Sequence, residues 1–383
     1  MSASSQSFAK DWFDLGLWRG GVSGNYKSIL SLQKNRDVGV FPHESQWVSE
    51  QRLRIEAELS QDYFRLELVN DFSLFLQSAN RPRIQVPDFS PKNVWNLDKR
   101  IIDEDSLILL SSLDRASVRI GTGYLNLTVG KQVVPTGVGH LFKAVSQVPR
   151  NPFLEIDPEF PVTEDAVALI WNGALAMEAR LLPRVQGQKL HNFHIRAKGS
   201  KSGYDVALTA GRSDDKSFIG LEVAGNLRGS LVRGELVSYQ HNNQDIFQGL
   251  LGFDTVFSRT LSGDFEIFYN GFGNSKPYLL QSPVHRPSPY LGRWYLGTRF
   301  RWEASALWKV VLFTIANVED PSVLTQLSVN YSLTSNSDLI FGQYLNIGSS
   351  QSEFGGLLLT PAGLAGPQLG LPDITYALYR YYF

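Results

Sequence analysis

Apolar and polar side chains alternate with a period of two residues along most of this chain. In the segment Arg293–Glu303, the even positions carry Trp at both ends with Leu, Thr and Phe between them, and four of the odd positions are charged. Successive side chains of a β-strand point to opposite faces, so this pattern predicts strands with one apolar and one polar face. Helical periodicity is nearly absent, and the chain is therefore predicted to be all-β.

The alternating segments number about eighteen, and the linkers between them are sorted by length. The segments begin near residues 20, 47, 63, 112, 124, 164, 174, 191, 203, 217, 230, 246, 261, 292, 307, 322, 337 and 373. Linkers after the even-numbered segments are short. The long linkers all follow odd-numbered segments, at about 77–111, 134–163, 272–291 and 348–372. A soluble sandwich or propeller gives no reason for this sorting, and no repeat of blade length is present.

Short turns at one rim, long loops at the other and an even strand count are typical of outer-membrane barrels. We therefore predict that residues 20–383 form a single transmembrane antiparallel β-barrel of about 18 strands. The short turns and both termini would lie in the periplasm, and the long loops would be extracellular. Residues 1–19 would form an N-terminal periplasmic segment, in which Phe8–Leu15 can form a short amphipathic helix. The first residues lack the features of a signal peptide, so we interpret them as a mature N-terminus preceded by an added Met.

The last strand of the predicted barrel carries an aromatic stripe. Ala377, Tyr379, Tyr381 and Phe383 share one parity, which we expect to face lipid, and Arg380 lies on the parity that would face the lumen. Outer-membrane barrels end in a strand of this kind that closes on the first strand. We therefore interpret Tyr379, Tyr381 and Phe383 as the signal that the barrel-assembly machinery reads.

Composition excludes several other classes of protein. No apolar run approaches the ~18 residues of a membrane-spanning helix, so a membrane location requires a closed barrel. The net charge of -1 shows no basic excess for binding nucleic acid. The chain has no Cys, which excludes disulfides, thiolate metal sites and covalently attached haem. Its six His lie in no nucleophile or metal-binding spacing, so we expect no enzyme activity, no catalytic residues, no metal and no cofactor.

The charged parity of the strands predicts the residues that line the pore. These are Arg52, Arg54, Glu56, Glu58, Arg65, Glu67, Arg115, Arg119, His194, Arg196, Lys198, Glu222, Arg233, Glu235, Asp264, Glu266, Arg293, Arg299 and Arg301. They either solvate the interior and cross-link neighbouring strands, or form a transverse field or sugar-binding edges at a constriction. Both signs of charge are well represented, which argues against a highly acidic polymer as the cargo.

The linker at 134–163 is a candidate constriction loop, because loops of this length are usually functional or disordered. Its prolines and apolar anchors indicate a packed loop, folded either into the lumen or over its mouth. The candidate residues are His140, Phe142, Lys143, Arg150, Phe153, Glu155, Asp157 and Glu159. The Gly-rich and Leu-rich linker at 348–372 is interpreted as more mobile or partner-facing than pore-lining.

A run of residues at the start of the 134–163 linker resembles a known pattern. In Leu125–Leu141, a strand ends in Gly-Lys-Gln, a Gly-containing turn opens a long loop, and Asp165 begins the next strand. This is similar to alginate-export-like barrels and to a broad group of porin-like proteobacterial barrels, although Lys131 stands where Arg is usual. Further segments similar to the second group are Tyr269–Gly271, Leu291–Leu296 and Ser352–Gly355. The resemblance implies an eighteen-stranded outer-membrane channel and does not identify the cargo.

The sequence leaves three functional hypotheses. The first is a passive channel for carbohydrate, and most concretely for export of an exopolysaccharide with a periplasmic or lipoprotein partner. The second is a general diffusion porin for small solutes. The third is a structural barrel that sheaths a partner protein, such as a multihaem cytochrome. All three place the chain in the bacterial outer membrane, in contact with its lipid and lipopolysaccharide, and without a nucleic-acid partner.

Overall fold

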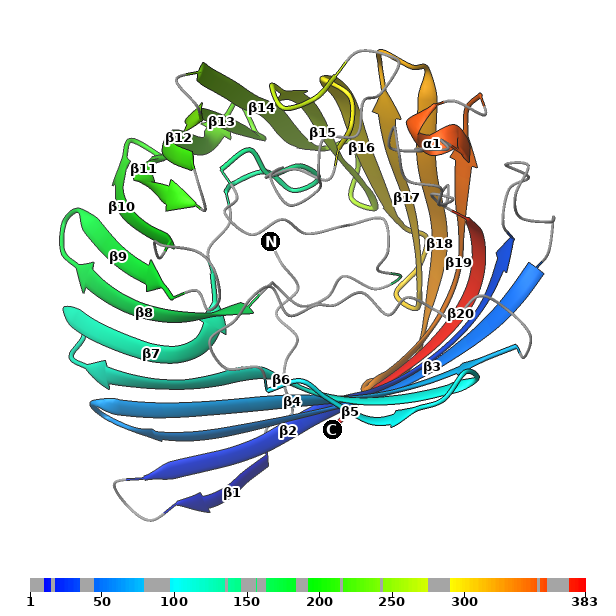
Figure 1. Cartoon of the computed structure of the whole chain (residues 1–383), viewed down its shortest axis with the longest axis horizontal. Coiled ribbons are helices and arrows are strands. Elements are labelled where there is room, and N and C mark those ends of the chain that lie inside the picture. The colour runs from blue at the N-terminus through cyan, green and yellow to red at the C-terminus, as the bar shows by residue number, and fades with distance from the viewer. Residues whose placement is uncertain are drawn as a thin grey trace, which may run out of the picture.

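The computed structural model is a ring of antiparallel strands that follow one another around the barrel in chain order (Figure 1). It describes residues 10–14, 18–34, 45–78, 97–134, 137–145, 156, 163–183, 192–213, 216–241, 244–274, 290–349, 352–356 and 372–383. This part of the chain contains twenty strands and one short helix. Two of the strands, β1 (Lys10–Asp14) and β5 (Lys99–Asp103), pair only with the edge of one other strand, so the remaining eighteen form the wall.

The wall is closed, since every wall strand pairs with a neighbour on each side. Its strands are β2 (Arg19–Lys34), β3 (Ser45–Gln61), β4 (Phe64–Gln77), β6 (Leu107–Gly121), β7 (Leu125–Val133), β8 (Thr163–Asn172), β9 (Ala176–Leu182), β10 (Asn192–Lys201), β11 (Tyr204–Ser213), β12 (Lys216–Leu227), β13 (Ser230–His241), β14 (Gln244–Val256), β15 (Leu261–Asn270), β16 (Trp294–Glu303), β17 (Trp308–Asn317), β18 (Ser322–Thr334), β19 (Ser337–Ile347) and β20 (Asp373–Tyr382). The helix α1 (Glu353–Gly356) lies in the linker between β19 and β20. The predicted closed antiparallel β-barrel of eighteen strands is confirmed.

Tight turns shape one rim of the barrel. At Ser202–Gly203 and Arg228–Gly229, both residues of a two-residue hairpin loop have positive φ, between 51° and 90°. Such turns match the right-handed twist of the strands that they join, and Gly adopts them without steric cost. We call this end the short-turn rim and the opposite end, where the 134–162 and 348–372 linkers leave the wall, the long-loop rim.

The ring closes between β2 and β20. Their register runs from Asn25 opposite Tyr382 to Lys34 opposite Asp373. Beyond it, Gly24 and Phe383 exchange two backbone hydrogen bonds of 2.9 and 3.0 Å. A Cβ on Gly24 would come within 2.8 Å of a carbon of the Phe383 ring. The glycine therefore makes room for the aromatic ring on the outer surface of the seam.

Two local predictions differ from the structure. The possible helix at Phe8–Leu15 is wrong over Lys10–Asp14, which form β1 along the edge of β2 just beyond the Gly24–Phe383 pair. Within the long linker at 77–111, the chain forms β5 on the edge of β6 beyond the end of β7. In both places a wall strand extends beyond the end of its neighbour. Its free N–H and C=O groups there can form hydrogen bonds with another strand. None of the helices in the described residues is long and apolar enough to cross a membrane.

The two faces of the wall differ in polarity, as the alternation predicted. Outward side chains are large, apolar and exposed, and Trp294 and Trp302 at the two ends of β16 are 46% and 50% exposed. Tyr381 and Phe383 also lie on the outer face, whereas Leu378 is buried and Arg380 forms an ion pair with Asp338. The outer surface of the ring is therefore largely apolar.

Candidate functional site: the barrel interior and its inward loop

One side of the interior is organised around a buried arginine. Arg54 on β3 is 1% exposed, and its guanidinium contacts Glu56 and Asp71 at 2.8 Å each and Asp114 at 2.5 Å. Asp114 reaches the interior because a bulge in β6 shifts the register against β4. Three carboxylates share one buried cation, and its charge and hydrogen bonds compensate for part of their desolvation.

The other predicted interior residues of β3, β4 and β6 form pairs nearer the rims. Arg115 contacts Glu67 at 2.8 Å, and Arg52 contacts Glu50 at 2.8 Å. Towards the short-turn rim, the pair of Arg65 and Glu58 is about half exposed, and Arg119 lies opposite Arg65 in the register. Exposed ion pairs of this kind contribute little to the stability of the barrel. They mainly determine which charges face the interior near this rim.

A second charged group lines β9 to β12. Arg180 and His194 converge on Glu178, with His194 Nε2 at 3.6 Å from its carboxylate. Arg196 binds both carboxylate oxygens of Glu222, at 3.2 and 2.8 Å. Such bidentate pairs fix the orientation of both side chains. Nearer the short-turn rim, the ammonium of Lys198 contacts Asp205 at 2.9 Å.

A third group lies on β13 to β16. Arg233 contacts Asp254 and, at 3.2 Å, Glu266. The fully buried carboxylate of Asp264 accepts from both Arg299 and Arg301, at 2.6 to 3.0 Å. The side chains of Arg299 and Arg301 remain partly exposed, at 28% and 40%. Two cations share one anion at Asp264, whereas two anions share the cation of Arg233, so the named charges of this group balance.

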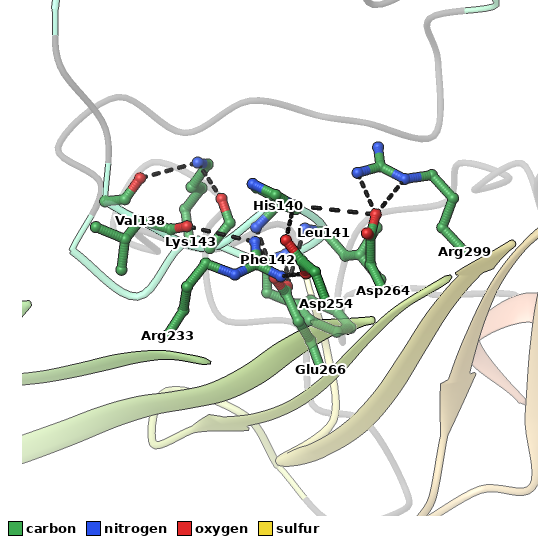
Figure 2. A network of polar contacts seen from close by, with 12 residues as sticks. Val138, His140, Leu141, Phe142, Lys143, Arg233, Asp254, Asp264, Glu266 and Arg299 are labelled. Atoms are coloured by element: carbon green, nitrogen blue, oxygen red, sulfur yellow. Dashed lines mark hydrogen bonds and ion pairs between the residues drawn. The ribbon is translucent and has the colours of Figure 1, made fainter. Parts of the chain in front are cut away.

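Two carboxylates of this wall hold a segment of the 134–162 linker inside the barrel. Figure 1 shows residues 137–145 within the ring beside β13 to β15, and Figure 2 shows part of the contact network. Glu266 accepts the backbone N–H groups of three consecutive residues, His140, Leu141 and Phe142, at 2.6, 2.9 and 2.9 Å. Glu235 accepts three more from Gly139, Ala144 and Val145, at 2.6, 2.7 and 2.9 Å.

Burial of Phe142 adds an apolar contact to this clamp. Phe142 is 1% exposed and stacks on Phe268 with the ring centroids 5.1 Å apart. It also meets Tyr290 edge-on at 5.2 Å and lies 6.1 Å from Tyr295. The ammonium of Lys143 donates to backbone carbonyls of the same loop, those of Gly137 and Gly139. Burial lowers the pKa of Lys143. The segment is thus a packed layer on the inner wall.

An apolar interior lies behind this layer, which the predicted charged lumen did not include. The buried cluster combines inward wall residues with loop residues. It contains Phe142, Val237, Tyr239, Leu250, Phe268, Tyr290, Tyr295, Ile315 and Phe354, among others. The interpretation of the 348–372 linker as mobile or partner-facing is therefore wrong for Glu353 and Phe354, which are buried against the wall. The inward parity of β13 to β18 contained this signal, because it is apolar at several positions.

His140, Asp254 and Asp264 bring possible metal ligands within 4.8 Å of one another. His140 Nδ1 lies 3.4 Å from Asp254 and 3.9 Å from Asp264. Burial, with Arg233 and Arg299 nearby, lowers the pKa of His140 to about 4, so the imidazole is neutral at neutral pH. Guanidiniums already contact both carboxylates. A divalent cation would lie beside these positive charges, and the group is better described as part of the loop contact.

The predicted loop and rim residues have different outcomes. Of the candidate constriction loop, His140, Phe142 and Lys143 lie inside the barrel, so the alternative of an external cap is wrong for them. Arg293 precedes β16 at the long-loop rim and is exposed there. The loop residues outside the described part of the chain are Arg150, Phe153, Glu155, Asp157 and Glu159. The interior groups that the prediction missed include Glu50, Asp114, Glu178, Arg180 and Asp254.

The Gly-Lys-Gln run at the end of β7 has a structural explanation. Gln132 is buried and donates to the carbonyl of Ala166 on β8 at 2.9 Å. Arg180 donates to the side-chain oxygen of Gln132 at 3.3 Å and to the carbonyl of Val133 at 2.8 Å. Lys131 lies opposite Asp165 in the register. These contacts fix the point at which the chain leaves the wall for the inward loop.

Comparisons with known proteins support the fold. Family models contain no match to this chain, and curated proteins contain none either. Among solved structures, OccAB2 of Acinetobacter baumannii is similar at a TM-score of 0.56 and 10% identity, over 95% of this chain and 98% of that chain. A mutant porin of Rhodopseudomonas blastica aligns over 95% of this chain and 100% of that chain, at a TM-score of 0.49 and 9% identity. The likeness to OccAB2 shows that this chain has the closed β-barrel fold of that protein.

Proposed function

We propose that this barrel spans the outer membrane of a Gram-negative bacterium and passes small hydrophilic solutes passively through a lumen narrowed by its own loop. The observation that carries the proposal is the clamp of Glu235 and Glu266 on residues 137–145. It fixes a loop on the inner wall, where the loop reduces the open cross-section. Assembly through Tyr379, Tyr381 and Phe383 and contact with outer-membrane lipid belong to the same proposal.

The distribution of polarity supports a location in the membrane. Exposed apolar side chains cover the outer face, with Leu251 68% exposed. The charged side chains lie on the opposite parity, where ion pairs such as Arg54 with Asp71 compensate for them. An outward apolar band with aromatic residues at both ends and a polar interior is the arrangement of transmembrane β-barrels. A water-filled passage along such an interior needs no energy source.

The inward loop favours small solutes over a threaded polymer or a sheathed protein. Residues 137–145 and 352–356 occupy interior space that a second protein inside the ring would need. Export of an exopolysaccharide with a periplasmic or lipoprotein partner remains a prediction that rests on the resemblance of Leu125–Leu141 to export barrels. Mono- and disaccharides fit both the mixed-sign interior and a narrowed passage, so small carbohydrates are the solutes to test first.

Swelling of proteoliposomes in isotonic solutions of sugars of increasing size tests the proposal. Permeation of a monosaccharide with a steep fall towards tetrasaccharides is the expected result, because the loop restricts the cross-section. Liposomes that contain the folded barrel and yet exclude every sugar and every small ion would reject it. An export role would show itself separately, as loss of secreted polysaccharide in a strain that lacks the chain.

A further inference from the structure

A carboxylate inside the long-loop rim is buried, and the described residues give it no cationic partner. Glu353, the first residue of α1, accepts from the Tyr295 hydroxyl at 2.6 Å and from the Asn317 amide at 2.7 Å. Its second oxygen accepts the backbone N–H of Leu291 at 2.9 Å. These donors come from β16, β17 and the linker before β16. Among the described residues, all of its hydrogen-bond donors are neutral.

A second acidic group lies next to this carboxylate. The backbone N–H of Glu353 donates to the buried carboxylate of Asp320 at 2.6 Å, and Ser322 donates to the other oxygen of Asp320. The pKa of Glu353 is raised to about 7, mainly by burial and further by the charge of Asp320. The hydrogen bonds from Tyr295, Leu291 and Asn317 act in the opposite direction. At the long-loop rim, the other titratable groups on or beside the elements around α1 include Tyr290, Arg293, Glu319 and Tyr344. Further along the same strands lie Arg299, Arg301, Glu303, Lys309, Tyr331 and Asp338.

The same residues connect this segment to the inward loop. Tyr295 binds Glu353 through its hydroxyl, and its ring lies 6.1 Å from that of Phe142. The ring of Tyr290 contacts both of these rings, with centroid distances of 5.2 Å to Phe142 and 4.8 Å to Tyr295. Phe354, next to Glu353, is 1% exposed in the same cluster. Undocking of α1 would therefore remove packing that supports residues 137–145.

We propose that Glu353 is a proton-sensitive latch that docks residues 352–356 inside the long-loop rim when protonated and favours their release when ionised. A buried carboxylate with neutral donors and an acidic neighbour costs free energy in its charged form, and undocking returns it to water. The docking is a property of the fold, and its effect on the width of the passage rests on the function proposed above.

Proton linkage determines the direction in which docking of residues 352–356 changes with pH. Docked Glu353 has a pKa of about 7, above the ordinary value of 4.5, so the docked state holds its proton more tightly than the released state. Docking is therefore most favourable at acid pH, weakens as the pH rises between these two values, and becomes constant above the higher one. Within that window the equilibrium constant for release rises by up to about tenfold per pH unit.

Labelling of a single introduced thiol can measure the release of residues 352–356, because the chain has no Cys of its own. Ser352→Cys places one thiol at a fully buried position in the docked segment. Ser305→Cys, in an exposed turn at the opposite rim, corrects for the pH dependence of the reagent. In the folded barrel in detergent, the ratio of the two labelling rates is expected to rise between about pH 5 and pH 7, by up to about tenfold per unit, and then to level off.

Two variants make the test specific. Glu353→Gln removes the titration, so the ratio should become independent of pH. Asp320→Asn removes the charge that raises the pKa of Glu353, so the midpoint of the rise should move to lower pH. A ratio that is flat in the parent protein, a rise that persists in Glu353→Gln, or an unchanged midpoint in Asp320→Asn would each overturn the latch. Labelling reports docking whether or not the barrel conducts, so a latch without sugar permeation would reject only the proposed function.

Discussion

Glu266 on β15 accepts the backbone N–H of His140 at 2.6 Å, which joins two residues 126 positions apart in the sequence. The same carboxylate accepts the next two N–H groups, and Glu235 accepts three others. A loop that leaves the wall must satisfy its own N–H groups, and buried ones need a partner within the protein. The two carboxylates supply this partner, so they determine where the loop lies.

Weakening the clamp should loosen the loop while the strands of the wall stay paired. In Glu266→Gln, the side-chain NH2 faces N–H donors, and at least one of the three loses its acceptor, at a cost of about 1–3 kcal/mol. Amide hydrogen exchange of residues 140–142 should accelerate by about tenfold to a hundredfold, with the wall strands unchanged. Glu303→Gln, at an exposed position on β16, is the matched control and should leave exchange as it is. Unaltered exchange in Glu266→Gln would contradict the clamp.

Removal of Arg54 should destabilise the barrel strongly. Arg54→Ala leaves Glu56, Asp71 and Asp114 close together and uncompensated, and breaking a buried ion network of this kind costs about 3–5 kcal/mol. The urea concentration at the unfolding midpoint should fall accordingly. Arg65→Ala disrupts a pair that is about half exposed, worth at most about 1 kcal/mol, and serves as the comparison. Equal effects of the two substitutions would show that the buried network has no special role.

A side chain at position 24 should weaken the seam. Gly24→Ala puts a Cβ within 2.8 Å of the Phe383 ring and closer still to the backbone of Arg54, so the β2–β20 register must shift. We expect a lower temperature for the heat-induced change in gel mobility and slower folding into detergent. Gly123→Ala, in a turn with nothing near its added Cβ, should behave like the parent protein. A seam that tolerates Gly24→Ala equally well would remove this explanation for the glycine.

The two faces of the wall should differ in their surroundings. A spin label at Leu251→Cys, on the exposed apolar face, should collide with dissolved oxygen far more than with a water-soluble nickel chelate in liposomes. A label at Lys198→Cys, on the charged parity and 43% exposed, should show the opposite preference. Preference of the Leu251 label for the nickel chelate would mean that this face is not in lipid.

Much of the barrel could be read from local pattern. The eighteen wall strands and their faces follow from alternation, since a strand with one buried face has no freedom in its parity. The inward position of Asp114 does not follow from alternation, because a bulge reverses the parity within β6. The residues of β1 fit a short helix as well as a strand, and the choice depends on the unpaired edge of β2 beyond Phe383. Such contacts are non-local.

The candidate site was predictable in part for the same reason. Glu235 and Glu266 could be assigned to the interior from their parity, but not to the backbone of a loop about a hundred residues away. The position of Glu353 depends on Tyr295 and Asn317, which come from two different strands. The sequence contains each group, and only the closed ring shows which groups meet.

Single-channel recording in planar lipid bilayers is the most direct test of a passive channel narrowed by its own loop. The parent protein should insert and give discrete steps of conductance that are linear in voltage. The double variant Glu235→Gln/Glu266→Gln should give larger steps, because the released segment 137–145 no longer narrows the passage. A correctly folded barrel that gives no conductance in either form, or steps of the same size in both, would contradict the account.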